Sequence, residues 1–436
     1  MTQSAPLAER LARMIRIPTV LGRGDGPFDE FVALLEELYP RVHTVLERER
    51  ITDRGLLFRW RGATEAEPLV LMAHYDVVPA NPDEWGEDPF GGRIADGWVH
   101  GRGALDDKGP LLVILEAAET LLEQGFSPAR DVYLSFGGNE ETYGEAAQRI
   151  AQTLAERRIR PWLVVDEGGA VVGAPLPFTR GRAAMIGTGE KGVATLRLDA
   201  TSDPGHASAP HGISAIERLA RATTRLRPST FRPRTPETIT RMLGSLADTA
   251  SGPARILYRA LSRSGFLAGR VFATLGGEPA ALVRTTIAAT MQDGGSAPNV
   301  LPADASVRFN LRIIPGETVD SVTRRVARRI NDDGVSIAIE EGSDPTSLSP
   351  ADGPQFGAIA AAIRAAYPDA VPTPYLMMQA SDARHFHAIS DHVYRFAPLE
   401  MSSEQRASIH GVGERVSVGS LESGRDFHIA LIRGLS

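Results

Sequence analysis

The first 170 residues alternate apolar runs with segments of helical periodicity. Residues 69–73 (LVLMA), 131–136 (DVYLSF) and 161–165 (PWLVV) have the length and composition of buried strands, and each is followed by polar or acidic residues. Residues 110–124 repeat apolar positions with a helical period, from Pro110 in the first turn to a stop at Gly125. This alternation predicts an α/β fold: a parallel or mixed sheet with helices on both faces, and ligands at the carboxyl ends of the strands.

The pattern changes near residue 190. The stretches GVATLRLDAT and ASVRFNLRIIPG alternate apolar and polar residues, which is typical of antiparallel strands with one solvated face. Between them, residues 225–290 form a long segment that contains Arg, Pro and helical stretches, and residues 354–368 resume the first pattern with a helix. We therefore predict a discontinuous α/β domain, residues 1–188 and 346–436, into which an α+β domain, residues 189–345, is inserted.

Composition excludes several classes of protein. The 436 residues contain no cysteine, so disulfides, thiol catalysis and Cys-type metal sites are excluded. The net charge of −7 gives no basis for nonspecific nucleic-acid binding, and no apolar run approaches the roughly 18 residues of a membrane span. The arginine-containing N-terminus predicts an amphipathic helix rather than a signal peptide. We expect a cytoplasmic protein with no nucleic-acid or membrane partner.

Acidic and histidine clusters follow the predicted strands or begin the predicted helix. They are His74-Tyr75-Asp76, Asp106-Asp107-Lys108, Asn139-Glu140-Glu141, Asp166-Glu167 and, in a polar loop, His410-Gly411. Each has an ordinary explanation, such as a surface turn or a helix cap, and the second cluster lacks the glycine pattern of a phosphate loop. Lys108 is one of only two lysines, and we expect it to offset local negative charge.

Taken together, these clusters supply two kinds of group that a metal hydrolase needs. The set of His74, Asp106, Glu141, Asp166 and His410 combines two imidazoles with three carboxylates. Such nitrogen and oxygen ligands suit two ions of zinc, cobalt or manganese bridged by one carboxylate. Asp76, two residues beyond His74, can orient its imidazole. A neighbouring Glu pair can divide the roles of ligand and proton acceptor.

The same stretches resemble the M20 metallopeptidases, a family that includes glutamate carboxypeptidase, aminoacylase and carnosinase. The resemblance runs from about residue 10 to residue 430, through HYDVVP, GRGALDDKG, GGNEETYG, VVDEGG, PGHASAP, NLRIIPG and IHGVGE. The DEGG and RHFH variants look most like the carboxypeptidase S and N-acyl-amino-acid hydrolase branch. Where many members have a Gly-Thr-Asp-like turn, this chain has Ala380-Ser381-Asp382.

The resemblance implies a role for individual residues. One zinc ion would be bound by His74, Asp106 and Asp166, and the other by Asp106, Glu141 and His410, with Glu140 as general base and Asp76 orienting His74. Either Asp166 or Glu167 matches the third position, and we favour Asp166. His206 resembles a histidine that stabilises the oxyanion in a partner subunit's active site, and Asn299 and Arg312 resemble residues that bind the substrate. The inserted domain would be the lid or dimerisation domain of a homodimer.

The leading hypothesis is therefore a di-zinc hydrolase that cleaves an amide bond next to a free carboxylate, as a carboxypeptidase or dipeptidase does. An N-acyl-amino-acid hydrolase and a catalytically inactive metal-binding scaffold are the alternatives. Three further histidines are less informative. His211 fits an ordinary loop residue, while His385 and His387 fit either the pocket wall or simple packing.

Overall fold

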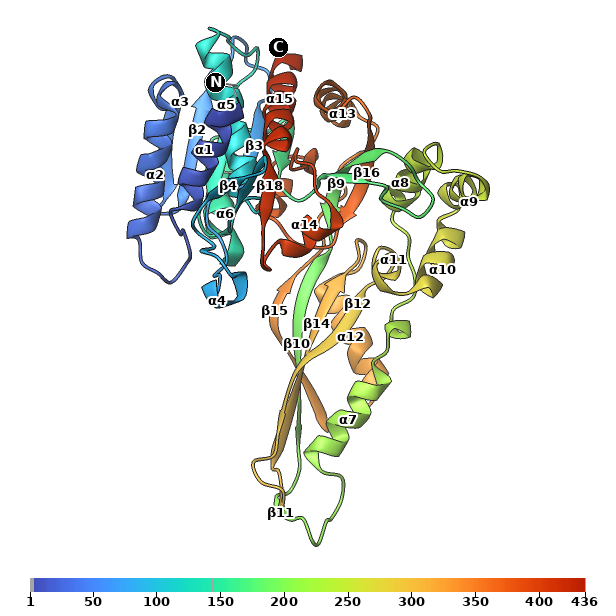
Figure 1. The fold of residues 1–436 in the computed structure, drawn as a ribbon. Helices are drawn as coiled ribbons and strands as arrows, with labels where there is room; N and C mark the ends of the chain where they lie inside the picture. Colours follow the sequence, from blue (N-terminus) through green and yellow to red (C-terminus); the bar gives the residue numbers. More distant parts are fainter. Residues whose placement is uncertain (1–3, 143, 436) are drawn as a thin grey trace.

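A nine-stranded mixed sheet forms the centre of the computed structural model, which describes residues 4–142 and 144–435 (Figure 1). The strand order is β1-β2-β6-β3-β7-β17-β9-β16, and β8 pairs with β9. β3 runs parallel to both β6 and β7, and β7 runs parallel to β17, whereas β2 joins β6 antiparallel. The strands are β1 (Glu47–Thr52), β2 (Gly55–Trp60), β3 (Leu69–His74), β6 (Val132–Gly137), β7 (Leu163–Asp166), β8 (Val171–Gly173), β9 (Arg182–Glu190), β16 (Ala370–Met377) and β17 (Val393–Arg395).

Helices cover both faces of this sheet, as the sequence predicts. In β3, Leu69 and Leu71 face one hydrophobic core, while Val70 and Met72 face another. Because this strand is buried on both sides, its sequence is an unbroken apolar run. The first core is built with α1, α2, α5, α13 and α15, and the second with α6 and η3. Their bounds are α1 (Ser4–Ile15), α2 (Gly26–Leu38), α5 (Lys108–Glu123), α6 (Glu145–Glu156), α13 (Pro354–Ala366), η3 (Asp382–Ala388) and α15 (Val418–Gly434).

Short elements bring distant parts of the chain together beside the sheet. A three-stranded sheet in the order β18-β5-β4 pairs the chain before residue 101 with the chain after residue 414. The remaining elements of this domain are α3 (Pro40–Val45), α4 (Pro82–Trp85), β4 (Arg93–Ala95), β5 (Trp98–His100), η1 (Glu140–Thr142), α14 (Ser403–Ser408) and β18 (Arg415–Ser417).

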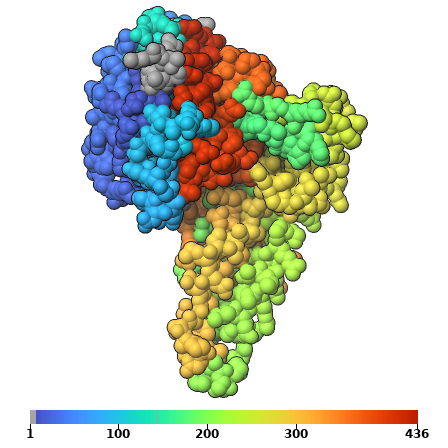
Figure 2. All heavy atoms as spheres, in the orientation of Figure 1, coloured from blue at the N-terminus to red at the C-terminus, as the bar shows by residue number. Residues whose placement is uncertain are grey.

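The inserted chain forms an arm that projects from this domain (Figures 1 and 2). Its antiparallel sheet has the order β12-β14-β10-β15, and β10 alternates buried and half-buried residues as the sequence predicts. Helices α7 and α12 cover one face, and a two-stranded pair, β11 with β13, lies at the far tip. The elements are β10 (Gly192–Thr201), β11 (Gly205–His206), α7 (Ala215–Arg225), η2 (Pro228–Thr230), β12 (Thr286–Gly294), β13 (Val300–Leu301), β14 (Asp304–Ile313), α12 (Val319–Ile330) and β15 (Val335–Ser343).

Four further helices of the inserted segment lie apart from the arm. They are α8 (Glu237–Ala247), α9 (Pro253–Ser262), α10 (Gly265–Leu275) and α11 (Gly277–Ala281). Their apolar sides share a core with Ala183 of β9 and Leu376 of β16, so this helical group packs on the edge of the large sheet. Among the described residues, no helix combines the length and apolar character needed to cross a bilayer.

Candidate metal centre

The candidate ligands lie where adjacent strands of the large sheet end. His74 is the last residue of β3, Glu141 follows β6 in η1, and Glu167 follows β7. Because these three strands are parallel neighbours, their carboxyl ends meet at one edge. Asp106 comes from the loop before α5, and His410 from the loop between α14 and β18.

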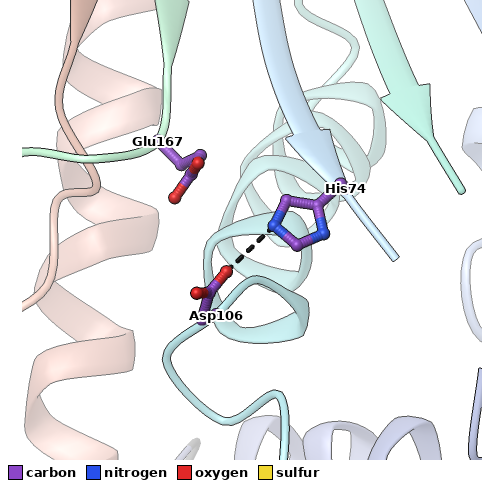
Figure 3. Close-up of side chains that lie close together, drawn as sticks. All are labelled: His74, Asp106 and Glu167. Atoms are coloured by element: carbon purple, nitrogen blue, oxygen red, sulfur yellow. Dashed lines mark hydrogen bonds and ion pairs between the residues drawn. The ribbon is translucent and has the colours of Figure 1, made fainter. Parts of the chain in front are cut away.

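Two groups of potential ligands share Asp106. His74, Asp106 and Glu167 form one group, and Asp106, Glu141 and His410 form the other; within each, one ligand atom per residue lies within 4.8 Å of the rest. His74 Nε2 is 2.9 Å from Asp106 Oδ1, and His410 Nε2 is 3.2 Å from Asp106 Oδ2 (Figure 3 shows the first group). Each carboxylate oxygen of Asp106 therefore faces a different histidine, which is the geometry of a bridging ligand.

The electrostatics of these groups fit a pair of cations. Burial raises the pKa of Glu167 well above its usual range, and the neighbouring Asp106 and Asp107 carboxylates raise it further. Hydrogen bonds to Asp106 and Glu141 raise the pKa of His410 to about 10. Oε1 of Glu141 is buried and receives no hydrogen bond from any residue that the structure describes. A divalent cation beside these side chains would relieve the repulsion and coordinate the unpartnered oxygen.

The geometry favours Glu167, and not the expected Asp166, as the third ligand of the first group. Asp166 is the last residue of β7, and its Oδ2 accepts the backbone N–H of Ala383 at 2.8 Å. Successive side chains of an extended chain point to opposite sides. Since Asp166 turns toward η3, Glu167 turns toward His74 and Asp106.

Asp76 connects the first group to the Glu pair. It is fully buried, and its Oδ1 lies 3.3 Å from His74 Nδ1. Its carboxylate accepts the backbone N–H groups of Glu140 at 3.1 Å and Glu141 at 3.0 Å. Asp76 therefore lies against Nδ1 of His74 through its carboxylate and its backbone carbonyl, which is 3.0 Å from the same nitrogen, and it also holds the turn that presents both glutamates.

Glu140 has the surroundings of a proton acceptor. Burial raises its pKa well above the usual range; the charge of His74 opposes this shift, while Asp382 and Asp106 add to it. A carboxylate made more basic in this way accepts a proton more readily near neutral pH.

A buried ion pair that sequence reasoning missed supports both groups. Glu414 accepts the backbone N–H groups of Leu105 at 2.7 Å and Asp106 at 3.1 Å. It also pairs with Arg102 at 2.7 Å, and Arg102 donates to the carbonyl of Gly411, next to His410. The motif IHGVGE contains Glu414, but a lone glutamate in a loop carries no signal of a partner more than 300 residues away.

Lys108 is fully buried, and its hydrogen bonds go to backbone carbonyls. Its Nζ donates to the carbonyls of Met14 and Ile17 at 3.0 and 2.6 Å. The ammonium therefore satisfies carbonyls at the end of α1, where a cation is favourable. Burial lowers the pKa of Lys108 to about 7, while the nearby carboxylates of Asp76 and Glu414 act in the opposite direction, in line with the expectation that Lys108 offsets negative charge.

The residue expected to stabilise the oxyanion, His206, and the expected substrate-binding residues lie in two other places. His206 and Asn299 lie at the tip of the arm, where β11 pairs with β13 and Ala207 N–H donates to the Asn299 carbonyl. The tip is remote from β3, at whose end the candidate ligand His74 lies (Figure 1). Arg312 on β14 lines a cavity of about 620 Å³ together with Arg384 and His385 of η3. His385 thus belongs to the cavity wall.

The other two histidines have ordinary surroundings. The ring of His387 is 3.1 Å from an Nη1 of Arg395, which makes it a packing residue. His211 is exposed in a loop, as expected.

A mixed sheet that gathers imidazoles and carboxylates around a shared aspartate defines a metal-dependent hydrolase of the α/β class. Residues 70–434 match the model of peptidase family M20/M25/M40, and the chain belongs to this family. The chain is 33% identical to a probable carboxypeptidase S-like 2 from Dictyostelium discoideum, covering 98% of this chain and 84% of that protein. It is 32% identical to the N-fatty-acyl-amino acid synthase/hydrolase PM20D1 from Xenopus tropicalis, covering 98% and 85%.

The fold also matches solved structures. An M20 family metallo-carboxypeptidase, Sso-CP2 from Sulfolobus solfataricus, superposes with a TM-score of 0.73 at 16% identity and covers 99% of both chains. At this identity the match establishes the fold, which is the mixed α/β architecture predicted from the sequence.

Proposed function

We propose that this chain is a two-metal hydrolase that cleaves an amide bond next to a free carboxylate. The observation that carries the proposal is the placement of Asp106 between two histidines, with one carboxylate oxygen toward each. His74, Asp106 and Glu167 would hold one ion, and Asp106, Glu141 and His410 the other. Zinc is the proposed metal, with cobalt or manganese as alternatives, because all ligand atoms are nitrogen or oxygen.

The bound metals would supply a nucleophilic water at neutral pH and polarise the scissile carbonyl. Glu140 would accept the proton of this water and return it to the leaving amine. Asp76 would keep His74 in the tautomer that leaves Nε2 free to bind metal, and would fix the position of Glu140 through its backbone N–H.

The remaining groups would act on the substrate. Arg312, which lines the cavity beside η3, would hold the free carboxylate through two parallel hydrogen bonds. Asn299 would contribute a polar contact. His206 would stabilise the oxyanion in the active site of a second subunit, because the arm carries it away from the metal ligands of its own chain (Figure 1). The working form would thus be a homodimer.

The substrate class is either a peptide or an N-acyl amino acid. The names of the relatives include both a carboxypeptidase and an N-fatty-acyl-amino acid hydrolase. A panel of dipeptides and N-acyl amino acids, assayed with added zinc, cobalt or manganese, separates the two. Hydrolysis of substrates with a free carboxylate, and not of their methyl esters or amides, supports the proposal. Full metal occupancy without hydrolysis of any member of the panel would instead identify an inactive scaffold.

A further inference from the structure

Helices α9 and α10 expose apolar side chains on the faces that point away from the protein. Tyr258 and Leu261 of α9 and Phe272 of α10 point into the core that packs on the large sheet. On the opposite sides, Ile256 is 73% exposed and Phe266 is 76% exposed. Leu257, Leu267 and Leu275 are exposed as well. We call this surface the α9–α10 face: Ile256, Leu257, Phe266, Leu267 and Leu275.

A neighbouring loop extends the face. Phe178, between β8 and β9, is 73% exposed. Its carbonyl accepts the backbone N–H of Ser251, and the carbonyl of Pro177 accepts the hydroxyl of Tyr258. These bonds fix Phe178 beside the start of α9. Exposed apolar side chains in this number, with a phenylalanine on α10 and another in the neighbouring loop, are unusual for a water-facing surface, which is normally polar.

The charged residues of α9, α10 and the turn between them are all arginines. Residues 249–277 contain four arginines (Arg255, Arg259, Arg263 and Arg270) and no Asp, Glu or Lys, although the whole chain carries −7. Asp248, just before this stretch, pairs with Arg259 at 2.6 Å and lies 3.9 Å from Arg255. Arg270 stacks over the ring of Phe266, with its guanidinium carbon 5.6 Å from the ring centroid. The helices that carry the apolar side chains therefore bear an excess of arginine in a chain of net negative charge, with Asp248 and Glu278 at the two ends of the stretch.

We propose that the α9–α10 face binds the surface of an anionic phospholipid membrane. Aromatic and aliphatic side chains that enter the headgroup region, flanked by arginines that pair with lipid phosphates, are the features of helices that lie on a membrane. A second copy of this face is a poor occupant, because a two-fold contact would bring two sets of four arginines together. A membrane as the partner of this face departs from the sequence-based expectation of no membrane partner.

The orientation of the molecule suits this attachment. α9 and α10 lie at the outer edge of the helical group, away from the arm tip at β11 and from β3, at whose end His74 lies (Figure 1). The proposal concerns a separate surface from the metal centre and does not depend on the proposed hydrolytic activity.

Flotation of the full-length chain with lipid vesicles tests the proposal. We expect binding to vesicles of phosphatidylglycerol and phosphatidylcholine in equal parts, and weak binding to phosphatidylcholine alone. Replacing Ile256, Phe266 and Leu267 together by Ser should weaken anionic-vesicle binding at least tenfold. Replacing Arg263 and Arg270 by Gln should weaken it roughly tenfold or more, and added salt should weaken binding of the parent.

Matched controls separate membrane binding from general effects. Val45→Ser and Ile339→Ser remove exposed apolar side chains elsewhere and should leave vesicle binding unchanged. Thermal unfolding confirms that each variant is folded. If the serine variant is not folded, the arginine variant still tests the proposal. The proposal is overturned if the parent does not float with anionic vesicles, or if both sets of substitutions leave binding intact. If the parent does not float, and the serine variant sediments at a lower mass than the parent, the face is instead a contact between copies of this chain.

Discussion

Removing the charge of Glu414 should separate the assembly of the metal centre from the general stability of the fold. Glu414 is fully buried, and its two oxygens accept four hydrogen bonds. In Glu414→Gln, the amide oxygen can keep the bonds to Leu105 and Asp106, but the amide NH₂ then faces the donors of Arg102 and Gly103. The shape of the side chain is preserved, so the effect reports on the lost acceptor and the lost charge.

The size of the effect follows from these contacts. Two hydrogen bonds to a charged group contribute about 1.5–3 kcal/mol each. Leaving a buried guanidinium such as Arg102 without its anion costs about 3–5 kcal/mol, which overlaps the roughly 3–6 kcal/mol that two such hydrogen bonds contribute together. We therefore expect the free energy of unfolding of the metal-free protein to fall by about 3–5 kcal/mol, a large part of the roughly 5–15 kcal/mol typical of folded proteins.

Metal affinity should fall in parallel, because the pair holds two ligands in place. Glu414 fixes the backbone of Asp106, and Arg102 fixes the carbonyl next to His410. Loss of such outer contacts typically weakens metal binding about 10–100-fold. Competition with a chromophoric chelator measures the zinc affinity, and denaturant unfolding in EDTA measures stability.

Glu116→Gln is the matched control. Glu116 is also buried and accepts from Arg10 at 2.7 Å and from Tyr39 at 3.0 Å, but it lies more than two turns into α5 and contacts no candidate ligand. The Glu116→Gln variant should have a lower free energy of unfolding than the parent but the same zinc affinity. If Glu414→Gln binds zinc as tightly as Glu116→Gln does, the ion pair stabilises the fold without positioning the ligands, and our reasoning is wrong.

Three further predictions concern catalysis and pH. Glu140→Gln should lower kcat roughly a hundredfold to ten-thousandfold while metal content stays at that of the parent, because only the proton acceptor is lost; full activity would refute its role. His206→Ala and Glu140→Gln subunits, each inactive alone, should regain activity when mixed and allowed to exchange, and a mixture that stays inactive argues against a shared active site. Burial raises the pKa of Asp382 to about 8 in the folded chain, so the folded state holds a proton that the unfolded state releases near pH 4. This contribution to stability is complete below about pH 4 and is lost as the pH rises through about 8. In EDTA, Asp382→Asn should therefore lose less stability than the parent over that interval, and equal pH profiles would contradict the assignment.

Much of the fold could be predicted from the sequence, because the burial of a strand determines the pattern of apolar and polar residues along it. A strand covered on both sides, such as β3, is apolar throughout, and a half-exposed strand, such as β10, alternates. The candidate ligands could be found for a related reason. His74 and the Glu140-Glu141 pair stand where apolar runs end, and parallel strands place those ends at one edge of the sheet. His74, Asp106, Glu141 and His410 are indeed brought together.

Other properties depended on contacts between residues far apart in the chain. Whether Asp166 or Glu167 faces the site depends on the residue at which β7 ends, and a shift of one position reverses the side chain. The partners of Glu414 and Lys108 come from distant segments, so their roles are invisible in the local pattern. Periodicity likewise shows that α9 and α10 have apolar residues on more than one side, but only packing decides which side is covered and which is left to solvent. Residue order thus determined the elements and the chemistry at their ends, whereas the tertiary structure decided direction, partnership and exposure, because these are set by neighbours in space.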